Sequence, residues 1–318
     1  MASPLVTIIC LCHNHEKYLV ETLASVLNQT YRPLELIVVD DASQDGSVAK
    51  IKAFLATHPT DIDTQTLFLE ENLGNCAAFN RGWGMARGEF VIDLATDDIM
   101  LPERVARQVN LFESLSNEHG VVFSESQYID EAGKPLHFHY GDQYRHISPI
   151  PVGYVYQDVL ARYFISSPTM MIRNEVLKKL NGYDETLAYE DFDFWVRSAR
   201  EYQYAYLDRC TTLVRRSGKS MSRGWYKSGD RQLLSTYRVC EKAGSLIRNQ
   251  GDREALAQRV KFELRQAVLS GLYEEADLFF NLLEKLDKIS LGYRLIRYIS
   301  ILKLDLRVVK YIYHRVKS

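Results

Sequence analysis

Two adjacent carboxylates stand at the end of an apolar run. Asp97 and Asp98 follow the stretch FVIDLAT and precede Leu101-Pro102, a pair typical of a helix start. Two buried acids side by side are costly unless a cation offsets their charge, and carboxylate oxygens suit Mg²⁺ or Mn²⁺ better than zinc. A third acid, Asp41, closes another apolar run, ELIVVDD. The pattern indicates a divalent-cation site, although an acid just before a helix also serves as an ordinary N-terminal cap.

Phosphate-binding loops of the common kinds are absent from the sequence. No G-x-x-x-x-G-K-[ST] occurs, which argues against a phosphate-loop NTPase, and no G-x-G-x-x-G follows a predicted strand, which argues against a dinucleotide site. A nucleotide at the acids would therefore be held through carboxylates and a metal ion. Mg²⁺ commonly takes one or two protein carboxylates and completes its shell with water and phosphate oxygens. This combination is typical of a site for a nucleoside diphosphate attached to a sugar.

A second pair of acids, Glu190-Asp191, begins a helix predicted over residues 190–202. The helix dipole favours the ionised form of an acid at this end by roughly 0.3–1 kcal/mol, and an ionised carboxylate can take up a proton as a general base. Helix capping is the simpler interpretation of the pair from spacing alone. Asp193 is the nearby alternative base, and its predicted place on the exposed helix face favours a solvated role.

The elements around these acids alternate between strand and helix. Continuous apolar runs predict strands, and apolar residues three and four apart predict helices. This alternation favours an α/β fold with a doubly wound sheet, in which ligands bind at the carboxyl ends of the strands. Asp41 and the pair Asp97-Asp98 are therefore expected in one crevice. The predicted strands are 5–12, 35–41, 66–69, 90–94, 121–124 and 168–173, and the predicted helices between and after them are 18–27, 48–55, 76–87, 102–112 and 190–202.

The later parts of the chain follow other patterns. Residues 125–165, which are rich in aromatic side chains, are predicted to be irregular. From residue 226 onward the pattern is helical, without a strand signal. We therefore expect a catalytic or binding domain over residues 1–225 and a helical C-terminal region over residues 226–318 that ends in a basic amphipathic tail.

Composition narrows the class of protein. The chain has 318 residues and a formal net charge of −2, so the whole molecule shows no bias toward nucleic acid. Its five cysteines are odd in number and widely scattered, which argues against a disulfide framework and for a reducing compartment. Cys10 and Cys12 are expected to pack in the core from one face of a strand. No secretory signal and no apolar stretch of 18 residues is visible.

The charge is unevenly distributed. Residues 288–318 hold eight Lys and Arg side chains against Asp305, a net charge of +7, so the preceding 287 residues carry −9. Basic side chains recur at spacings of four and three that form one stripe on a helix, beside a broad apolar face. We expect this helix to lie on an anionic membrane surface; docking on the acidic remainder of the chain is the alternative. The stripe consists of Lys303, Arg307, Lys310, His314 and Lys317.

Five motifs in order resemble the family-2 glycosyltransferases, whose fold is called GT-A. The resemblance extends from about Val6 to Ser222, and the five motifs together give it its specificity, since each alone is weak to moderate. They read VTIICLCHNHEKYL, ASVLNQTYRPLELIVVDDASQDGS, ENLGNCAAFNRGWGMARGEF, LATDDIMLP and NGYDETLAYEDFDFWVR. Two positions depart from the family pattern. Ala95 stands where an acid often begins the metal motif, and Ser217 stands where many members have a His near the diphosphate.

The resemblance implies roles for individual residues. Asp98 is expected to bind the metal ion directly and Asp97 to lie nearer the ribose. Asp191 is expected to be the general base. Glu190 and Trp225 are candidates for the acceptor side, Trp225 because it lies in a Gly-rich polar segment. The nucleobase and the rest of the nucleotide-sugar are expected to contact Asp41, Cys12, His13, Asn14, Asn72, Gly74 and Asn75.

The reaction implied is transfer of a sugar from a nucleoside-diphosphate donor, with UDP favoured, to a saccharide or lipid-linked saccharide acceptor. A Mg²⁺ or Mn²⁺ ion assists departure of the diphosphate, and direct displacement inverts the anomeric carbon. Bacterial envelope or O-antigen synthesis at the cytoplasmic face of the plasma membrane fits this reaction. The alternative from another class is a non-catalytic protein of the same fold that binds nucleotide-sugars or carbohydrates, and the presence of both Asp98 and Asp191 argues against it. The sequence does not indicate the oligomeric state.

Overall fold

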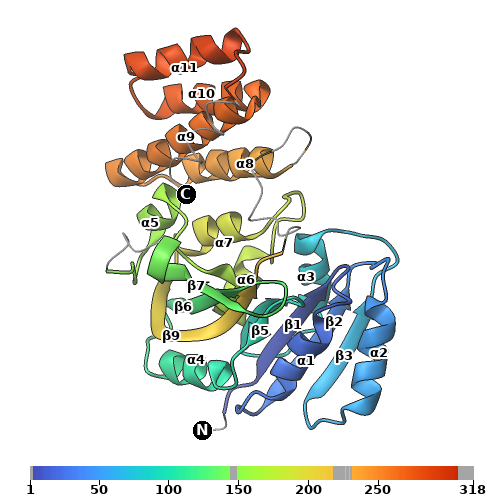
Figure 1. The fold of residues 1–318 in the computed structure, drawn as a ribbon. Helices are drawn as coiled ribbons and strands as arrows, with labels where there is room; N and C mark the ends of the chain where they lie inside the picture. Colours follow the sequence, from blue (N-terminus) through green and yellow to red (C-terminus); the bar gives the residue numbers. More distant parts are fainter. Residues whose placement is uncertain (1–2, 144–148, 218–225, 227–228, 230, 307–318) are drawn as a thin grey trace. The chain divides into compact units, whose positions relative to one another are not determined.

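The computed structural model describes residues 3–143, 149–217, 226, 229 and 231–306 (Figure 1). The chain divides into two compact units. The first consists of Met1–Val155, Phe164–Thr186 and Glu201–Gly218, and the second of Tyr156–Tyr163, Leu187–Arg200 and Lys219–Ser318. The second unit therefore includes two segments that precede residue 225, where the sequence suggested a domain boundary.

The first unit is built on a nine-stranded mixed sheet. Four strands in the order β3-β2-β1-β4 are parallel, as the alternating sequence pattern predicted. The order continues β8-β6-β9-β5, and the short β8 runs antiparallel to both of its neighbours. The strands are β1 Val6–Cys12, β2 Leu34–Asp40, β3 Asp63–Phe68, β4 Phe90–Ala95, β5 Ile99–Met100, β6 His119–Ile129, β7 Pro135–Phe138, β8 Met171–Arg173 and β9 Gln203–Arg215.

The central strands are buried along their whole length. Every residue of β1 and β2 is buried, because helices cover both faces of a parallel sheet. Cys12 of β1 pairs with Asp40 of β2, and Leu11 pairs with Ala95 of β4. These three strands therefore end level with one another, and the loops that follow them meet at one edge of the sheet.

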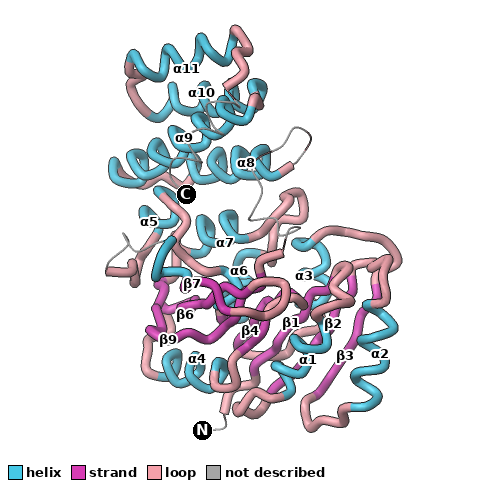
Figure 2. The backbone as a smooth tube through the Cα atoms, in the orientation of Figure 1, coloured by secondary structure: helices cyan, strands magenta, loops and turns pink. Residues whose placement is uncertain are grey.

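Helices lie on both faces of this sheet (Figure 2). One face packs α1, α2 and α4 in a core that includes Cys10 and Cys12, as expected from their spacing. The other face packs α3, where Gly82 approaches so closely that an added Cβ would lie 2.8 Å from Val39 and 2.9 Å from Ile9. The helices of this unit are α1 Leu19–Leu27, α2 Ser47–Thr57, α3 Asn75–Trp83, α4 Arg104–Glu113 and α6 Asn174–Leu180.

The second unit is helical, as the sequence after residue 226 predicted. Its longest helix, α9, packs against α5, α8 and α10. The Asn249 side chain caps the start of α9 by accepting a hydrogen bond from the Asp252 backbone, and Gly271 ends the helix with a left-handed φ of 74°. The helices are α5 Tyr156–Ala161, α7 Asp191–Ser198, α8 Gln232–Ser245, α9 Gln250–Ser270, α10 Tyr273–Leu286 and α11 Leu291–Ile301.

Three predictions about the elements differ from the structure. Residues 125–165 are not irregular throughout, since β6 continues to Ile129 and β7 and α5 follow. The reason is pairing with β9, which gives this stretch a partner far along the chain. Pro102 precedes α4 by two residues and is not its first residue. Helix α6 was missed.

The predicted basic tail lies largely outside the described residues. Of its five basic side chains only Lys303 is described. Among the helices that the structure does describe, none has the length and apolar character needed to cross a lipid bilayer.

Candidate active site

The loops after β1, β2 and β4 are joined to one another at the edge of the sheet. The Asp41 backbone N–H donates to the Cys12 carbonyl at 2.8 Å, and the Thr96 N–H donates to the Leu11 carbonyl at 2.9 Å. The ring of His15 also links the loop after β1 to the loop after β4, with Nδ1 at 2.9 Å from Thr96 Oγ1. The structure therefore brings Asp41 and the acid pair to the same edge, as the sequence predicted.

His13 is fixed by the loop after β2. Its Nδ1 lies 2.8 Å from the Asp41 carbonyl oxygen, which can only accept a hydrogen bond, so Nδ1 carries the proton. The Nε2 atom then accepts from the side-chain amides of Asn14 at 2.9 Å and Asn72 at 3.0 Å. The imidazole is thus held in one orientation between two loops expected to contact the nucleotide.

Asn14 holds the β1 loop against the β2 loop. Its backbone has a left-handed φ of 58°, a conformation that Asn tolerates better than most side chains. Its side-chain oxygen accepts from the Gln44 backbone N–H at 2.7 Å, and its own N–H donates to Ser43 Oγ at 2.8 Å. Asn14 therefore links the loops after β1 and β2 beside His13.

Asp41 secures the loop before α3. Its carboxylate is 6% exposed and accepts from the backbone N–H groups of Leu73 at 2.7 Å and Gly74 at 2.9 Å. Gly74 has a φ of 85°, a value that disfavours any side chain there. Asn75 then begins α3. Each oxygen of Asp41 retains a second lone pair for a ligand, so the predicted contact with a nucleobase remains a prediction.

The two acids after β4 have different surroundings. The Asp98 side chain is buried, its residue 4% exposed, and Oδ1 accepts from the Arg215 backbone N–H at 2.9 Å. Burial, and next the charge of Asp97, raise the pKa of the Asp98 carboxyl well above its usual range. The Asp97 side chain is 20% exposed, and Oδ2 lies 4.0 Å from Nε2 of His15.

Arg215 is the residue that sequence reasoning missed. Besides its bond to Asp98, it donates from Nε to the Asp97 carbonyl at 3.1 Å, and its Nη2 pairs with Glu21 at 2.6 Å. Its guanidinium also lies over the ring of Tyr18. The sequence signal for it is the pair Arg215-Arg216 directly after the segment TTLV. A cation follows this segment, just as the acids Asp41 and Asp98 follow theirs.

Asp191 lies in the second unit and begins α7, as predicted. The segment before it is tied to α8: the Ala188 N–H donates to Ser235 Oγ at 2.9 Å, and the Tyr189 hydroxyl lies 2.6 Å from that of Thr236. Glu190 is the residue just before the helix. These bonds fix the approach to α7 and so orient the first turn, which carries Asp191.

Asp193 corrects an expectation about the helix surface. It was placed on the exposed face, yet it is 1% exposed and pairs with Arg197 at 2.6 Å and with Lys242 at 2.7 Å. Each of its two carboxylate oxygens is therefore engaged by a cation of the second unit. Trp195, which follows two residues later, is a buried core residue, whereas Trp225 lies outside the described residues.

A buried ion pair in α9 lies next to Phe192 of α7. Arg259 and Glu263 of α9 are 2% and 0% exposed, and Arg259 Nη1 lies 3.3 Å from Glu263 Oε1. The Arg259 guanidinium lies 5.1 Å from the ring centre of Phe192, the neighbour of Asp191, and 3.9 Å from that of Tyr163. Burial raises the pKa of Glu263 and the nearby guanidinium opposes this shift.

The chemistry of the donor set fits a divalent cation that takes few protein ligands. Within the described residues no group of three or more His, Cys, Asp and Glu side chains could hold a metal ion by itself. A cation that keeps water and phosphate oxygens needs only one or two carboxylates. The Asp97 side chain, partly exposed at the sheet edge, meets that need together with an anionic ligand.

Comparison with known proteins agrees with this geometry. The family model described as glycosyl transferase family 2 matches residues 7–180, more than half of the chain. An uncharacterized glycosyltransferase of Methanocaldococcus jannaschii is 30% identical over 64% of this chain and 68% of the relative. A putative teichuronic acid biosynthesis glycosyltransferase of Bacillus subtilis, TuaG, is 26% identical over 75% of this chain and 89% of its own length.

Solved structures share the fold at low identity. S. aureus TarS residues 1–349, in complex with UDP-GlcNAc, superimposes with a TM-score of 0.67 at 19% identity over 88% of this chain and 80% of that chain. The mannosyltransferase PcManGT of Pyrobaculum calidifontis, in complex with GDP-Man and Mn²⁺, superimposes with a TM-score of 0.57 at 19% identity, covering 97% and 87%. The chain belongs to glycosyl transferase family 2 and is a glycosyltransferase with the GT-A fold.

Proposed function

We propose that the enzyme transfers a sugar from a nucleoside-diphosphate donor to a saccharide or lipid-linked saccharide acceptor, with inversion at the anomeric carbon. One observation carries the donor side of this proposal. Three parallel strands end level, and their loops bring His13, Asp41 and Asp97-Asp98 to one edge of the sheet in a chain of this family. This placement supports the proposal that the nucleobase and the diphosphate of one donor bind side by side at this edge.

The nucleoside is proposed to bind between the first two loops. Asp41 would accept a hydrogen bond from the base, and His13, Asn14 and the Cys12 backbone would border it. Asn72, Gly74 and Asn75 would line the far side, because Asp41 and His13 already hold that loop in place. UDP is the proposed nucleotide; TarS is a structural neighbour with bound UDP-GlcNAc, and PcManGT one with bound GDP-Man.

A Mg²⁺ or Mn²⁺ ion is proposed to bind at the acid pair. The family resemblance assigned the direct contact to Asp98 and the ribose side to Asp97. Burial now favours Asp97 for the direct contact, since Asp98 is enclosed and bonded to Arg215. A bound divalent cation would offset the negative charge of the departing diphosphate. Asp98 would then hold the turn on which Asp97 stands.

Asp191 is proposed to be the general base. The bond from the anomeric carbon to the diphosphate oxygen breaks as the bond to the acceptor oxygen forms, and the hydroxyl proton passes to the Asp191 carboxylate. Attack from the face opposite the diphosphate inverts the carbon. Glu190 and Trp225 are proposed on the acceptor side. The two ion pairs of Asp193 favour Asp191 over it as the proposed base.

The acceptor is proposed to belong to the bacterial envelope, where lipid-linked saccharides and polymers are extended. The B. subtilis relative TuaG, a putative teichuronic acid biosynthesis glycosyltransferase, supports this. An O-antigen intermediate is another acceptor of this chemical class. We further propose that the enzyme acts at the cytoplasmic face of the plasma membrane, bound to anionic lipid through its C-terminal helices.

A panel of nucleotide-sugars tests the proposal. Each is incubated with the protein with and without EDTA, and slow hydrolysis and the shift in thermal unfolding are measured. We expect one UDP-sugar to stabilise the protein and to be hydrolysed, with both effects lost in EDTA and restored by Mn²⁺ or Mg²⁺. Stabilisation by a sugar nucleotide without turnover on any acceptor would favour a non-catalytic binding protein.

A further inference from the structure

The last described helix presents apolar side chains to solvent. Four residues of α11 and its C-terminal end share one face, because they are spaced four, three and four apart. Ser300, on the opposite face, is 2% exposed, so the helix packs on the side away from these four residues. The outward residues are Leu291, 81% exposed, Leu295, 62%, Tyr298, 64%, and Leu302, 66%. We call these four residues the α11 face.

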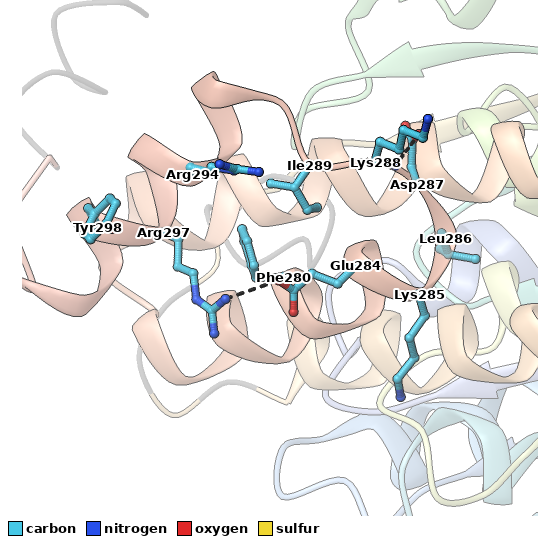
Figure 3. Close-up of a pocket in the computed structure, with 10 residues that line it drawn as sticks. All are labelled: Phe280, Glu284, Lys285, Leu286, Asp287, Lys288, Ile289, Arg294, Arg297 and Tyr298. Atoms are coloured by element: carbon cyan, nitrogen blue, oxygen red, sulfur yellow. Dashed lines mark hydrogen bonds and ion pairs between the residues drawn. The ribbon is translucent and has the colours of Figure 1, made fainter.

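A basic pocket adjoins the α11 face (Figure 3). It has a volume of about 820 Å³ and lies between α10 and α11. Tyr298 belongs both to the face and to the pocket lining, so the two features are continuous. Four cations line the pocket: Lys285, Lys288, Arg294 and Arg297.

The acids of this pocket are already paired. Glu284 pairs with Arg297 at 3.3 Å, and Asp287 pairs with Lys261 at 2.5 Å. Within the described part of the chain, Lys285, Lys288 and Arg294 have no carboxylate within ion-pair distance. Three uncompensated cations beside an exposed apolar stripe form an anion-binding rim next to a surface that water disfavours.

We propose that the α11 face inserts into the headgroup region of an anionic lipid bilayer, with lipid phosphates bound by Lys285, Lys288 and Arg294. A helix with an apolar face and flanking cations suits that interface, because the apolar side chains leave water while the cations stay at the phosphates. Charge complementarity favours an anionic membrane over a second copy of the chain at this face. A second copy of the chain packed two-fold on the same face would bring the two basic pockets together and repel.

This surface gives the membrane partner proposed above a location among the described residues. It lies apart from the donor site in sequence, and hydrolysis of a soluble nucleotide-sugar does not require it. The two proposals therefore fail separately: donor turnover can be absent while vesicles still bind, and the reverse.

Vesicle flotation of the full chain tests the inference. Vesicles of phosphatidylcholine alone are compared with vesicles that contain three parts phosphatidylglycerol to seven parts phosphatidylcholine, at low and high salt. One double variant, Leu295→Ser with Leu302→Ser, removes apolar contact. Another, Lys288→Ser with Arg294→Ser, removes charge. Leu136→Ser and Lys52→Ser are matched controls, because these side chains are also exposed and lie in the first unit.

We expect the wild type to float with phosphatidylglycerol vesicles at low salt and far less with phosphatidylcholine alone. Each double variant should need at least tenfold more lipid for half-binding, while both controls stay within twofold and all variants keep their thermal stability. The inference is overturned if the wild type ignores anionic vesicles, or if both double variants bind like the wild type. It is also overturned if the apolar variant changes an oligomer into a monomer without lipid, which would make the α11 face a self-association surface.

Discussion

The backbone nitrogen of Arg215 donates a 2.9 Å hydrogen bond to Oδ1 of Asp98, although 117 residues separate the two. This bond, with the buried charges of Arg215 and Arg104 nearby, compensates an acid that the sheet edge encloses. Part of the positive charge that offsets the acid pair therefore comes from arginine side chains of the protein itself. Substitution of Asp98 is therefore expected to affect mainly stability, and substitution of Asp97 mainly nucleotide binding.

Asp98→Ala should unfold more easily, whereas Asp97→Ala should not. Removing Asp98 leaves the buried Arg215 amide without its acceptor, at a cost of about 1–3 kcal/mol in the free energy of unfolding. Asp97→Ala should cost less than about 1 kcal/mol, since the side chain is partly exposed and its nearest cationic group, His15, is 4.0 Å away, yet lose metal-dependent binding of the nucleotide. Urea unfolding and calorimetry with UDP, with and without Mn²⁺, measure these effects. Wild-type nucleotide binding by Asp97→Ala would return the metal contact to Asp98.

Asp191→Asn should lose transfer while retaining the donor. A base acts on the acceptor hydroxyl, so turnover should fall by roughly 10²–10⁴-fold, with donor affinity within a few-fold of wild type. Asp193→Asn is the matched control on the same helix. It weakens two buried ion pairs, so we expect lower stability and much smaller loss of turnover per folded molecule. Near-normal turnover in Asp191→Asn would make Glu190 the next candidate.

Arg259 and Glu263 should be strongly coupled in their contribution to the free energy of unfolding. Arg259→Met leaves Glu263 buried without its cation, which should cost about 3–5 kcal/mol in the free energy of unfolding. Adding Glu263→Leu should recover a large part of this loss, since no buried charge then remains unpaired. A double-mutant cycle by chemical denaturation measures the coupling. Simple additivity of the two changes would show that the pair does not act as a unit.

The stability of the first unit should fall between pH 6.5 and about 4 because of His139. Burial, the main cause, lowers the pKa of this imidazole to about 4, helped by the charge of Arg216. Its Nε2 lies 3.0 Å from the Phe164 carbonyl and its Nδ1 lies 2.8 Å from the Tyr128 hydroxyl, so Nε2 donates and Nδ1 accepts.

The sign follows from proton uptake. In this window the unfolded imidazole binds a proton that the folded one does not, so the free energy of unfolding falls as the pH falls, by up to about 3 kcal/mol. Unfolding curves of the wild type and His139→Gln at pH 7 and pH 4.5 measure the difference. We expect a smaller pH dependence in the variant. An equal loss of stability between pH 7 and pH 4.5 in both proteins would show that other groups cause the pH dependence.

The sequence predicted the strands that carry the donor site because they are continuous apolar runs. β1, β2 and β4 are buried throughout or nearly so, and their register brings Asp41 and Asp97 together. The second half of β6 was not predicted, because it begins with the polar run SESQ, which carries no apolar period, and it is held by pairing with β9. Local periodicity does not reveal a partner strand some 85 residues downstream.

The same limit applies to single side chains. Asp193 was assigned to an exposed face because polar spacing on a helix is typical of solvent. Its burial depends on Lys242, 49 residues later in the chain, which no local pattern indicates. Asp191 at the start of α7 was predictable because a helix start has its own local signature.

The position of β9 has a consequence for synthesis on the ribosome. This strand joins the sheet between β6 and β5, and it supplies the Arg215 amide to Asp98. At a translation rate of roughly 5–20 residues per second, the acid pair leaves the ribosome on the order of ten seconds before Arg215 does. During that interval the nascent chain has an incomplete sheet with exposed strand edges, the kind of surface that chaperones bind. A fragment that stops at residue 180, where the family match ends, would remain in that state.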